Sequence, residues 1–211
     1  MRIEKLVTGP YQTNCYLLFK GEMAWVIDPA DEAKRILERL NNLKGVILTH
    51  FHYDHLLALP QLIKAFPTAD IFMHPLDSPY LGPLGGEALG AFARSIDPAF
   101  SHLDVSFWRS LPAATVLVEE GDVIPEIGLE VMHTPGHSLG SICLYKEGSL
   151  FAGDTLFANS IGRTDLIHSD PALIVNSIKT KLLTLPKATV VYPGHGPETT
   201  IGKELANNPF L

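Results

Sequence analysis

Residues 48–56 read LTHFHYDHL, and they hold three of the nine histidines of the chain together with one aspartate. The stretch ends an apolar, β-branched run that predicts a buried strand, and it precedes a segment that predicts a helix. Its polar side chains therefore lie in one turn between a strand and a helix. Imidazole and carboxylate groups are ligands of borderline cations such as zinc. If this turn belongs to a metal site, further ligands must come from equivalent positions at other strand ends.

Three such side chains are present. His137 ends GLEVMHTPGH, Asp154 ends SLFAGD and His195 ends TVVYPGH, each after an apolar run and a small or glycine-containing turn. Glycine lets the backbone bend tightly, and strands that lie side by side bring their ends to one edge. The candidate metal ligands are thus His50, His52, Asp54, His55, His137, Asp154 and His195. Seven ligands exceed one tetrahedral site and suit two metal ions with a bridging carboxylate.

The other histidines do not belong to this pattern. His133 lies near His137, and we interpret it as structural. His74, His102 and His168 do not fit any ligand pattern in the sequence.

The predicted elements favour an α/β protein. Strands are predicted at 2–9, 14–21, 23–30, 44–50, 69–75, 114–124, 128–136, 140–154 and 189–196, and helices at 31–43, 56–66 and 171–185. The second half repeats the first coarsely, and no linker divides them. We expect one domain over residues 1–211, with two sheets packed together inside and helices outside.

Residues 78–112 differ in character from the rest of the chain. They are rich in Gly and Pro and contain the aromatic residues Tyr80, Phe92, Phe100, Phe107 and Trp108. We expect loops and a helical piece. Two interpretations stand: a packed surface segment, or a lid or substrate wall.

The composition excludes several classes of protein. With 46% apolar and 18% charged residues the chain is of ordinary globular composition, and a formal net charge of −7 disfavours nucleic acid as a partner. The first residues contain no apolar signal-peptide core, and no run reaches the roughly 18 apolar residues of a membrane span. Cys15 and Cys143 lie in apolar, strand-like stretches, which predicts two buried thiols. We expect a cytoplasmic protein that acts on a small molecule.

These ligand motifs resemble those of the metallo-β-lactamase superfamily of hydrolases and, more narrowly, the single-domain glyoxalase II-like (hydroxyacylglutathione hydrolase-like) group. The resemblance runs from NCYLL at residue 14 to the end of the chain. It implies an αββα sandwich with the metals at one edge. It also implies a first metal on His50, His52 and His137, a second on Asp54, His55 and His195, and Asp154 as the bridge.

The resemblance and the residues together point to hydrolysis. Two cations, which we expect to be zinc although iron and manganese also suit these ligands, lower the pKa of a shared water. The resulting hydroxide attacks a carbonyl, and Asp54 helps to orient it. We find no convincing serine nucleophile and Cys143 lies mid-strand, so the metals carry the chemistry. A thiolate leaves without a dedicated acid, which favours a thioester. The resemblance points to S-lactoylglutathione, with lactones and other esters as alternatives.

Two features bear on the substrate. Full-length glyoxalase II has a C-terminal helical domain that helps to bind glutathione, whereas this sequence ends 16 residues after His195. We therefore expect substrate contacts from the core or from 78–112. Arg163, in SIGRTD, resembles a basic position of the family near the substrate carboxylates. It is either an anion hook or the partner of Asp165 in an ion pair.

Other activities of the superfamily remain as alternatives. β-Lactamases generally lack the bridging aspartate and are exported, which argues against antibiotic hydrolysis. Persulfide dioxygenases share a GRTD segment and hold one iron on the counterparts of His50, His137 and Asp154. A nuclease would carry an extra substrate domain, and a non-enzymatic metal protein would need a closed site.

Overall fold

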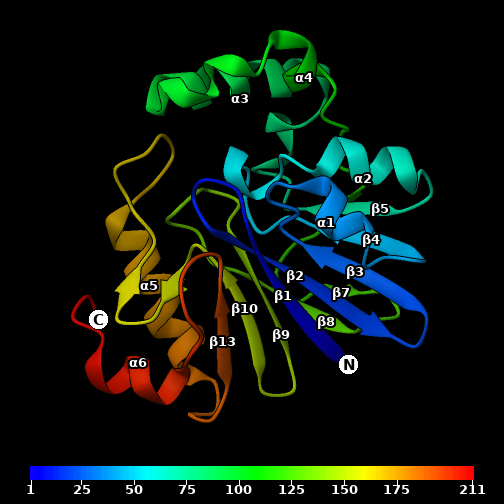
Figure 1. The fold of residues 1–211 in the computed structure, drawn as a ribbon. Helices are drawn as coiled ribbons and strands as arrows, with labels where there is room; N and C mark the ends of the chain where they lie inside the picture. The colour runs from blue at the N-terminus through cyan, green and yellow to red at the C-terminus, as the bar shows by residue number, and fades with distance from the viewer.

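The computed structural model describes residues 1–98 and 100–211 in full and residue 99 by its backbone alone. Two six-stranded sheets pack face to face (Figure 1). The first sheet runs, in spatial order, β1 (Arg2–Thr8), β2 (Thr13–Lys20), β3 (Met23–Ile27), β4 (Leu43–Ile47), β5 (Asp70–Met73) and β6 (Val116–Leu117). The second runs β14 (Thr199–Thr200), β13 (Val190–Pro193), β10 (Ser149–Gly153), β9 (Ile142–Lys146), β8 (Leu129–His133) and β7 (Val123–Ile124).

Helices cover the outer face of each sheet, as Figure 1 shows. On the first sheet lie α1 (Ala33–Leu37) and α2 (Leu59–Ala65), whereas α3 (Gly82–Ile96) and α4 (Val105–Arg109) pack on each other beyond its edge (Figure 1). On the second lie α5 (Pro171–Thr180) and α6 (Ile201–Asn207). The chain therefore forms the expected αββα sandwich. Among the described residues, no helix has both the length and the hydropathy that crossing a membrane requires.

Strand alternation explains the layers. Successive side chains of a strand point to opposite faces, so Leu17 of β2 packs under the outer helices while Leu18 packs between the sheets. Trp25 of β3 and Phe151 of β10 also fill the space between the sheets, and both are fully buried. Burying one such side chain stabilises the fold by about 2–3 kcal/mol.

Strand direction decides where the polar turns lie. Strands β3, β4 and β5 are parallel, so their carboxyl ends meet at one edge of the first sheet. In the second sheet β10 is parallel to β13 and antiparallel to β9, which is antiparallel to β8. Hence β8, β10 and β13 also end at one edge. The amide of Ile142 donates to the carbonyl of Thr49 at 2.9 Å, which joins this edge to the end of β4.

The structure corrects several predicted elements. The helix predicted at 31–43 covers only Ala33–Leu37, and the helix predicted at 56–66 begins at Leu59. Pro60 therefore lies in the first turn, where its missing N–H removes no helical hydrogen bond. The strand predicted at 114–124 is two short strands, β6 and β7, that belong to different sheets. The sequence analysis also missed α6, β14 and the hairpin of β11 (Leu156–Phe157) and β12 (Ser160–Ile161).

The segment 78–112 is more helical than expected, because α3 spans 15 residues. Its glycines permit close packing and do not break the helix. A Cβ on Gly90 would lie 2.4 Å from Cγ of Trp108, and one on Gly86 would lie 2.0 Å from the Trp108 carbonyl oxygen. Trp108 of α4 is itself fully buried by this contact.

Candidate metal centre

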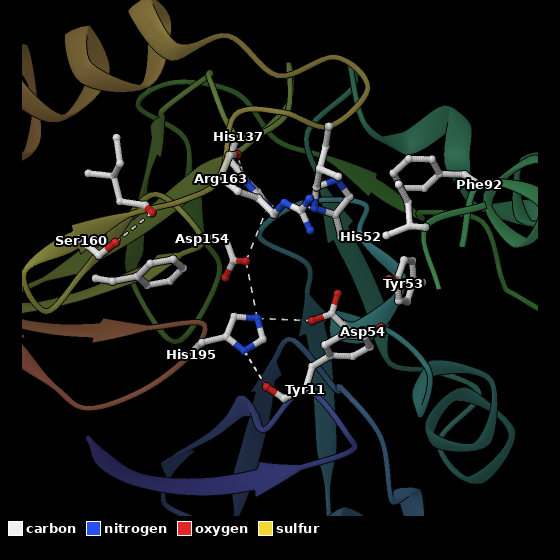
Figure 2. Close-up of a pocket in the computed structure, with 14 residues that line it drawn as sticks. Tyr11, His52, Tyr53, Asp54, Phe92, His137, Asp154, Ser160, Arg163 and His195 are labelled. Atoms are coloured by element: carbon white, nitrogen blue, oxygen red, sulfur yellow. Dashed lines mark hydrogen bonds and ion pairs between the residues drawn. The ribbon is translucent and has the colours of Figure 1, made fainter. Parts of the chain in front are cut away.

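The structure brings all seven predicted ligand side chains together at the edge where these strands end. His50, His52, Asp54 and His55 lie on the turn after β4, which closes with a short 3-10 helix over Tyr53–His55. The other three follow the ends of β8, β10 and β13: His137, Asp154 and His195. Figure 2 shows five of the seven around one cavity.

The ligand atoms form two groups. One nitrogen each from His50, His52 and His137 lies within 4.8 Å of the others, and the same limit holds for atoms of Asp54, His55 and His195. We name these groups the first triad (His50, His52, His137) and the second triad (Asp54, His55, His195). The side chains of the first triad are buried, whereas that of His195 is 28% exposed.

Asp154 lies between the two triads. Its Oδ2 is 3.6 Å from Nε2 of His137 in the first triad and 3.5 Å from Nε2 of His195 in the second. Its Oδ1 is 3.4 Å from Nε2 of His55. A carboxylate in this position can contact a cation in either triad, which is the geometry that the bridging role requires.

The unpaired atoms of the centre suit bound cations. Nε2 of His50, His52 and His55 and Oδ1 of Asp154 are buried and have no hydrogen-bond partner. Leaving a buried polar atom unpaired costs about 1–3 kcal/mol, and here several such atoms converge. Imidazole nitrogen and carboxylate oxygen are both good ligands for zinc, iron and manganese. The donor set therefore fits the two metal ions that the fold family implies.

The electrostatics of the first triad favour neutral imidazoles. Burial, reinforced by the neighbouring imidazoles, holds the pKa values of His50 and His52 well below the ordinary value, and burial also lowers the pKa of His137. Neutral imidazole is the form that binds a metal ion.

The second triad lies among carboxylates. Burial opposes protonation of His55, but the charges of Asp154, Asp54 and Asp28 raise its pKa well above the ordinary value. The pKa of His195 rises to about 10 against the effect of burial, mainly because Asp154 is adjacent. Together the carboxylates create a strongly negative environment in which positive charge is stabilised.

The second nitrogen of several ligand histidines is held by a hydrogen bond. Nδ1 of His137 donates to the carbonyl of Arg163 at 2.9 Å, and Nδ1 of His195 donates to the carbonyl of Tyr11 at 3.1 Å. Nδ1 of His55 is 2.9 Å from Oδ2 of Asp28. Such contacts fix the ring orientation and place Nε2 beside the other candidate ligands.

Asp28 is a functional residue that the sequence analysis missed. It is 1% exposed, and it accepts hydrogen bonds from the amide and hydroxyl of Thr49 at 2.8 and 2.7 Å as well as contacting His55. The Thr49 hydroxyl in turn contacts Nδ1 of His50 at 2.9 Å. One oxygen of Asp28 also lies within 4.8 Å of a ring nitrogen of His50 and of His55. Because these hydrogen bonds occupy its oxygens, we assign it an orienting role.

An open cavity of about 430 Å³ lies over the centre (Figure 2). Its floor contains five of the candidate ligands: His52, Asp54, His137, Asp154 and His195. Its walls are mostly apolar or aromatic: Tyr11, Tyr53, Phe92, Ile96, Phe157, Ser160, Ile161, Arg163 and Leu166. Helix α3, within the predicted segment 78–112, contributes Phe92 and Ile96, and the Phe92 ring stacks on His52 with centroids 5.9 Å apart.

Arg163 forms an ion pair with Asp165 and also lines the cavity, the two features that the sequence suggested. Its guanidinium forms a two-pronged ion pair with Asp165, with two contacts of 2.8 Å, and lowers the pKa of that carboxyl to about 2. The same side chain lines the cavity, and its carbonyl holds His137.

Neither cysteine is placed to act as a nucleophile. Cys15 and Cys143 are fully buried, form no disulfide and are absent from the cavity lining. Burial raises the pKa of the Cys15 thiol, and it raises that of Cys143 to about 11. Both groups are therefore protonated thiols at neutral pH.

Two of the remaining histidines pair away from the centre. The rings of His74 and His133 stack with centroids 4.0 Å apart, and Nε2 of His133 contacts the carbonyl of Leu139 at 2.9 Å. His74 is only 4% exposed. Burial, with a smaller effect of His133, lowers the pKa of His74 to about 4.

This shift predicts a pH-dependent stability. An unfolded histidine titrates near 6.5, so between pH 6.5 and 4 the unfolded chain binds a proton that native His74 does not, and stability falls as the pH falls. We expect His74→Gln to reduce the loss of unfolding free energy between pH 7 and pH 5 by about 2 kcal/mol. Urea titrations at both pH values measure it, with exposed His168→Gln as the control. An equal loss in wild type and His74→Gln would contradict this assignment.

Comparison with known proteins agrees with the fold and the centre. A family model described as the metallo-beta-lactamase superfamily matches residues 8–195. This chain therefore belongs to the metallo-β-lactamase superfamily, whose members are generally metal-dependent hydrolases.

Individual relatives cover the whole chain. It is 34% identical to the probable metallo-hydrolase YqgX of Bacillus subtilis and 34% identical to the hydroxyacylglutathione hydrolase GloC of Haemophilus influenzae, over 100% of this chain and 98% of each relative. Among solved structures, BLEG-1, described as a B3 metallo-beta-lactamase, matches with a TM-score of 0.84 and 35% identity, over 100% of this chain and 99% of that one. TTHA1623 in a di-iron-bound form matches with a TM-score of 0.81 and 37% identity, over 99% of this chain and 100% of that one.

Proposed function

We propose that this protein hydrolyses a thioester of a hydroxy acid at a centre of two metal ions, with S-lactoylglutathione as the favoured substrate. One observation carries the proposal: seven candidate ligand side chains, several with buried unpaired atoms, converge under an open cavity whose lining includes no cysteine. The relative from Haemophilus influenzae, described as a hydroxyacylglutathione hydrolase, supports the substrate class.

The metal ions, zinc in our proposal, would supply Lewis acidity that activates water and polarises the substrate carbonyl. The first triad and the second triad would hold one ion each, and Asp154 would contact both. Asp54 lines the cavity, and its Oδ2 accepts a hydrogen bond from the Thr13 hydroxyl at 3.1 Å. We assign Asp54 a second role: it orients the attacking water and accepts its proton.

The cavity suits a substrate whose leaving group departs without protonation. Its lining residues include no lysine and no further carboxylic acid besides Asp54 and Asp154. A thiolate departs without protonation, whereas an amide nitrogen needs an acid. The aromatic and aliphatic walls suit the acyl group and the thiol arm, with α3 in the role of substrate wall. Arg163 would meet a substrate carboxylate at the edge of the cavity.

The first experiment is hydrolysis of S-lactoylglutathione by the zinc-loaded protein, followed as loss of thioester absorbance, with a neutral aryl thioester beside it. We expect a kcat/KM on the order of 10⁴ M⁻¹s⁻¹ or more for the glutathione ester. Hydrolysis of the neutral ester alone would support a thioesterase whose substrate does not contain glutathione. No hydrolysis of either ester would refute the proposal, and persulfide-dependent oxygen uptake by the iron-loaded protein would then identify a dioxygenase.

β-Lactam hydrolysis is a second candidate. The similarity to BLEG-1, described as a B3 metallo-beta-lactamase, favours it. The test is a chromogenic cephalosporin in the same assay. Turnover of the β-lactam with a kcat/KM above that of both thioesters would show that the protein is a β-lactamase and not a thioesterase.

Arg163→Ala tests the anion hook. Loss of the guanidinium should raise KM for S-lactoylglutathione about tenfold, because a charge-assisted hydrogen bond is lost, and leave KM for the neutral ester unchanged. Asp165→Asn should act oppositely and lower KM for the acidic substrate, because it frees the guanidinium. Arg109→Ala, which breaks an exposed pair with Glu87, is the control. An equal effect of Arg163→Ala on the KM of both esters would show that Arg163 does not bind the substrate carboxylate.

A further inference from the structure

Asp77 is a buried carboxylate outside the ligand set. It follows β5 at the same edge as the metal centre, and it is 1% exposed. Ionised side chains are rarely buried without compensation, because the loss of solvation costs several kcal/mol. No ion pair with Asp77 is present among the described residues, so hydrogen bonds must provide the compensation.

All three donors to Asp77 lie on the loops that carry the first triad. Its Oδ2 accepts from the Phe51 amide at 3.1 Å and from the Ser138 hydroxyl at 2.6 Å, and its Oδ1 accepts from the Gly140 amide at 2.7 Å. Phe51 lies between His50 and His52 in the sequence, and Ser138 directly follows His137. One carboxylate therefore joins the turn after β4 to the loop between β8 and β9.

The loop between β8 and β9 packs closely against the Asp77 carboxylate. A Cβ on Gly140 would lie 2.6 Å from Cγ and Oδ1 of Asp77, so glycine is required for this approach. The Ser138 hydroxyl also contacts the Ser141 hydroxyl at 2.7 Å, which stiffens the loop further. The two loops must be in register, because Nδ1 of His52 and Nε2 of His137 are only 2.8 Å apart across them.

The second triad has a different support. Asp28 contacts His55 directly, and the carbonyl of Tyr11 holds His195. Asp77 bonds to the turn after β4 only at Phe51, between His50 and His52, and none of its hydrogen bonds reaches the loop of His195. Asp28 reaches the first triad only at His50, through Thr49. Asp77 thus links the segments that carry His52 and His137, beside the backbone hydrogen bond from Ile142 to Thr49.

We propose that Asp77 is a positioning residue that aligns the two loops of the first triad and so sets the metal affinity of that half of the centre. This inference rests on the proposed metal centre and is independent of the substrate. It goes beyond the ligand set, because Asp77 contacts neither the cavity nor a ligand atom.

The test measures zinc affinity by competition with a chromophoric chelator in two backgrounds. His195→Ala keeps the first triad intact, and His137→Ala keeps the second. We expect Asp77→Asn to lower zinc affinity about 10–100-fold in the His195→Ala background, the range for loss of a residue that orients metal ligands. In the His137→Ala background we expect a change below about threefold. Equal losses in both backgrounds, or no loss in the first, would overturn the proposal.

Controls separate this role from general destabilisation. Asp70→Asn alters an exposed carboxylate at the start of the same strand, which accepts from the Thr115 hydroxyl at 3.1 Å, and should change neither affinity. Ser138→Ala removes one of the three donors, and it should lower affinity in the His195→Ala background only. That variant decides the question if Asp77→Asn does not fold, as judged by circular dichroism of the metal-free protein. Absence of zinc binding by wild type would instead refute the metal centre itself.

Discussion

Asp154→Ala is expected to lose at least one of two bound metal ions and nearly all activity. Its carboxylate lies within 3.4–3.6 Å of three imidazole nitrogens, from both triads. Removal of the charge leaves His55 and His195 without their main electrostatic partner, and it would leave each proposed metal ion one ligand short. We expect kcat/KM for the thioester to fall by about 10³-fold, equivalent to several kcal/mol of transition-state stabilisation. Metal analysis per chain and initial rates at saturating zinc measure both effects.

Two further variants make this prediction specific. Asp154→Asn keeps the size and one ligand oxygen but removes the charge, so it should retain more metal than Asp154→Ala and remain impaired in rate. Asp165→Ala removes an exposed carboxylate outside the centre and should retain two metal ions. Full activity of Asp154→Ala with two metal ions bound would show that the bridging assignment is wrong.

The sequence predicts the positions of the ligands because strand ends are local features. An apolar run followed by a glycine-containing turn and a polar side chain fixes where that side chain emerges. The parallel directions of β8, β10 and β13 then bring His137, Asp154 and His195 together. The pattern could therefore indicate which side chains gather at the candidate centre, and an α/β domain with two packed sheets, without knowledge of the strand order.

Residues that act through distant hydrogen bonds left no such signal. Asp28 contacts Thr49 and His55, which are 21 and 27 residues away, and Asp77 contacts Ser138 over 61 residues. In the sequence each is a single acidic residue after an apolar strand. A positive φ of 50° at Asp28 marks it in the structure, but the sequence does not reveal that angle.

The misassigned elements have a similar cause. Glycine in 78–112 indicates a loop when only local propensity is considered, whereas Gly86 and Gly90 lie within α3 because Trp108 packs against them. Residues 114–124 have strand-like composition throughout, but the chain crosses from one sheet to the other between β6 and β7. Both outcomes depend on tertiary packing, which overrides local preference.

Gly194→Ala is expected to disrupt the centre while sparing the fold. A Cβ at this position would lie 2.1 Å from Oδ1 of Asp154 and 2.8 Å from Cε1 of His55. The Asp154 carboxylate can rotate away at little cost to folding, but it then loses the position between the two triads. We expect loss of at least one zinc ion and a fall in kcat/KM of about 10²–10³-fold, with a change in unfolding free energy of about 1 kcal/mol. Metal analysis, initial rates and urea titration measure these three quantities.

Gly196→Ala is the matched control on the other side of His195. It has a φ of 73°, and a Cβ there would meet no heavy atom within 4 Å. Its cost is therefore backbone strain of about 1 kcal/mol, with no displacement of a ligand. We expect it to keep both metal ions and nearly full activity, although its stability falls as much as that of Gly194→Ala. If both variants lose metal equally, the loop conformation rather than the Asp154 position controls the centre. If Gly194→Ala keeps two metal ions and full activity, Asp154 does not need the position in which the structure places it.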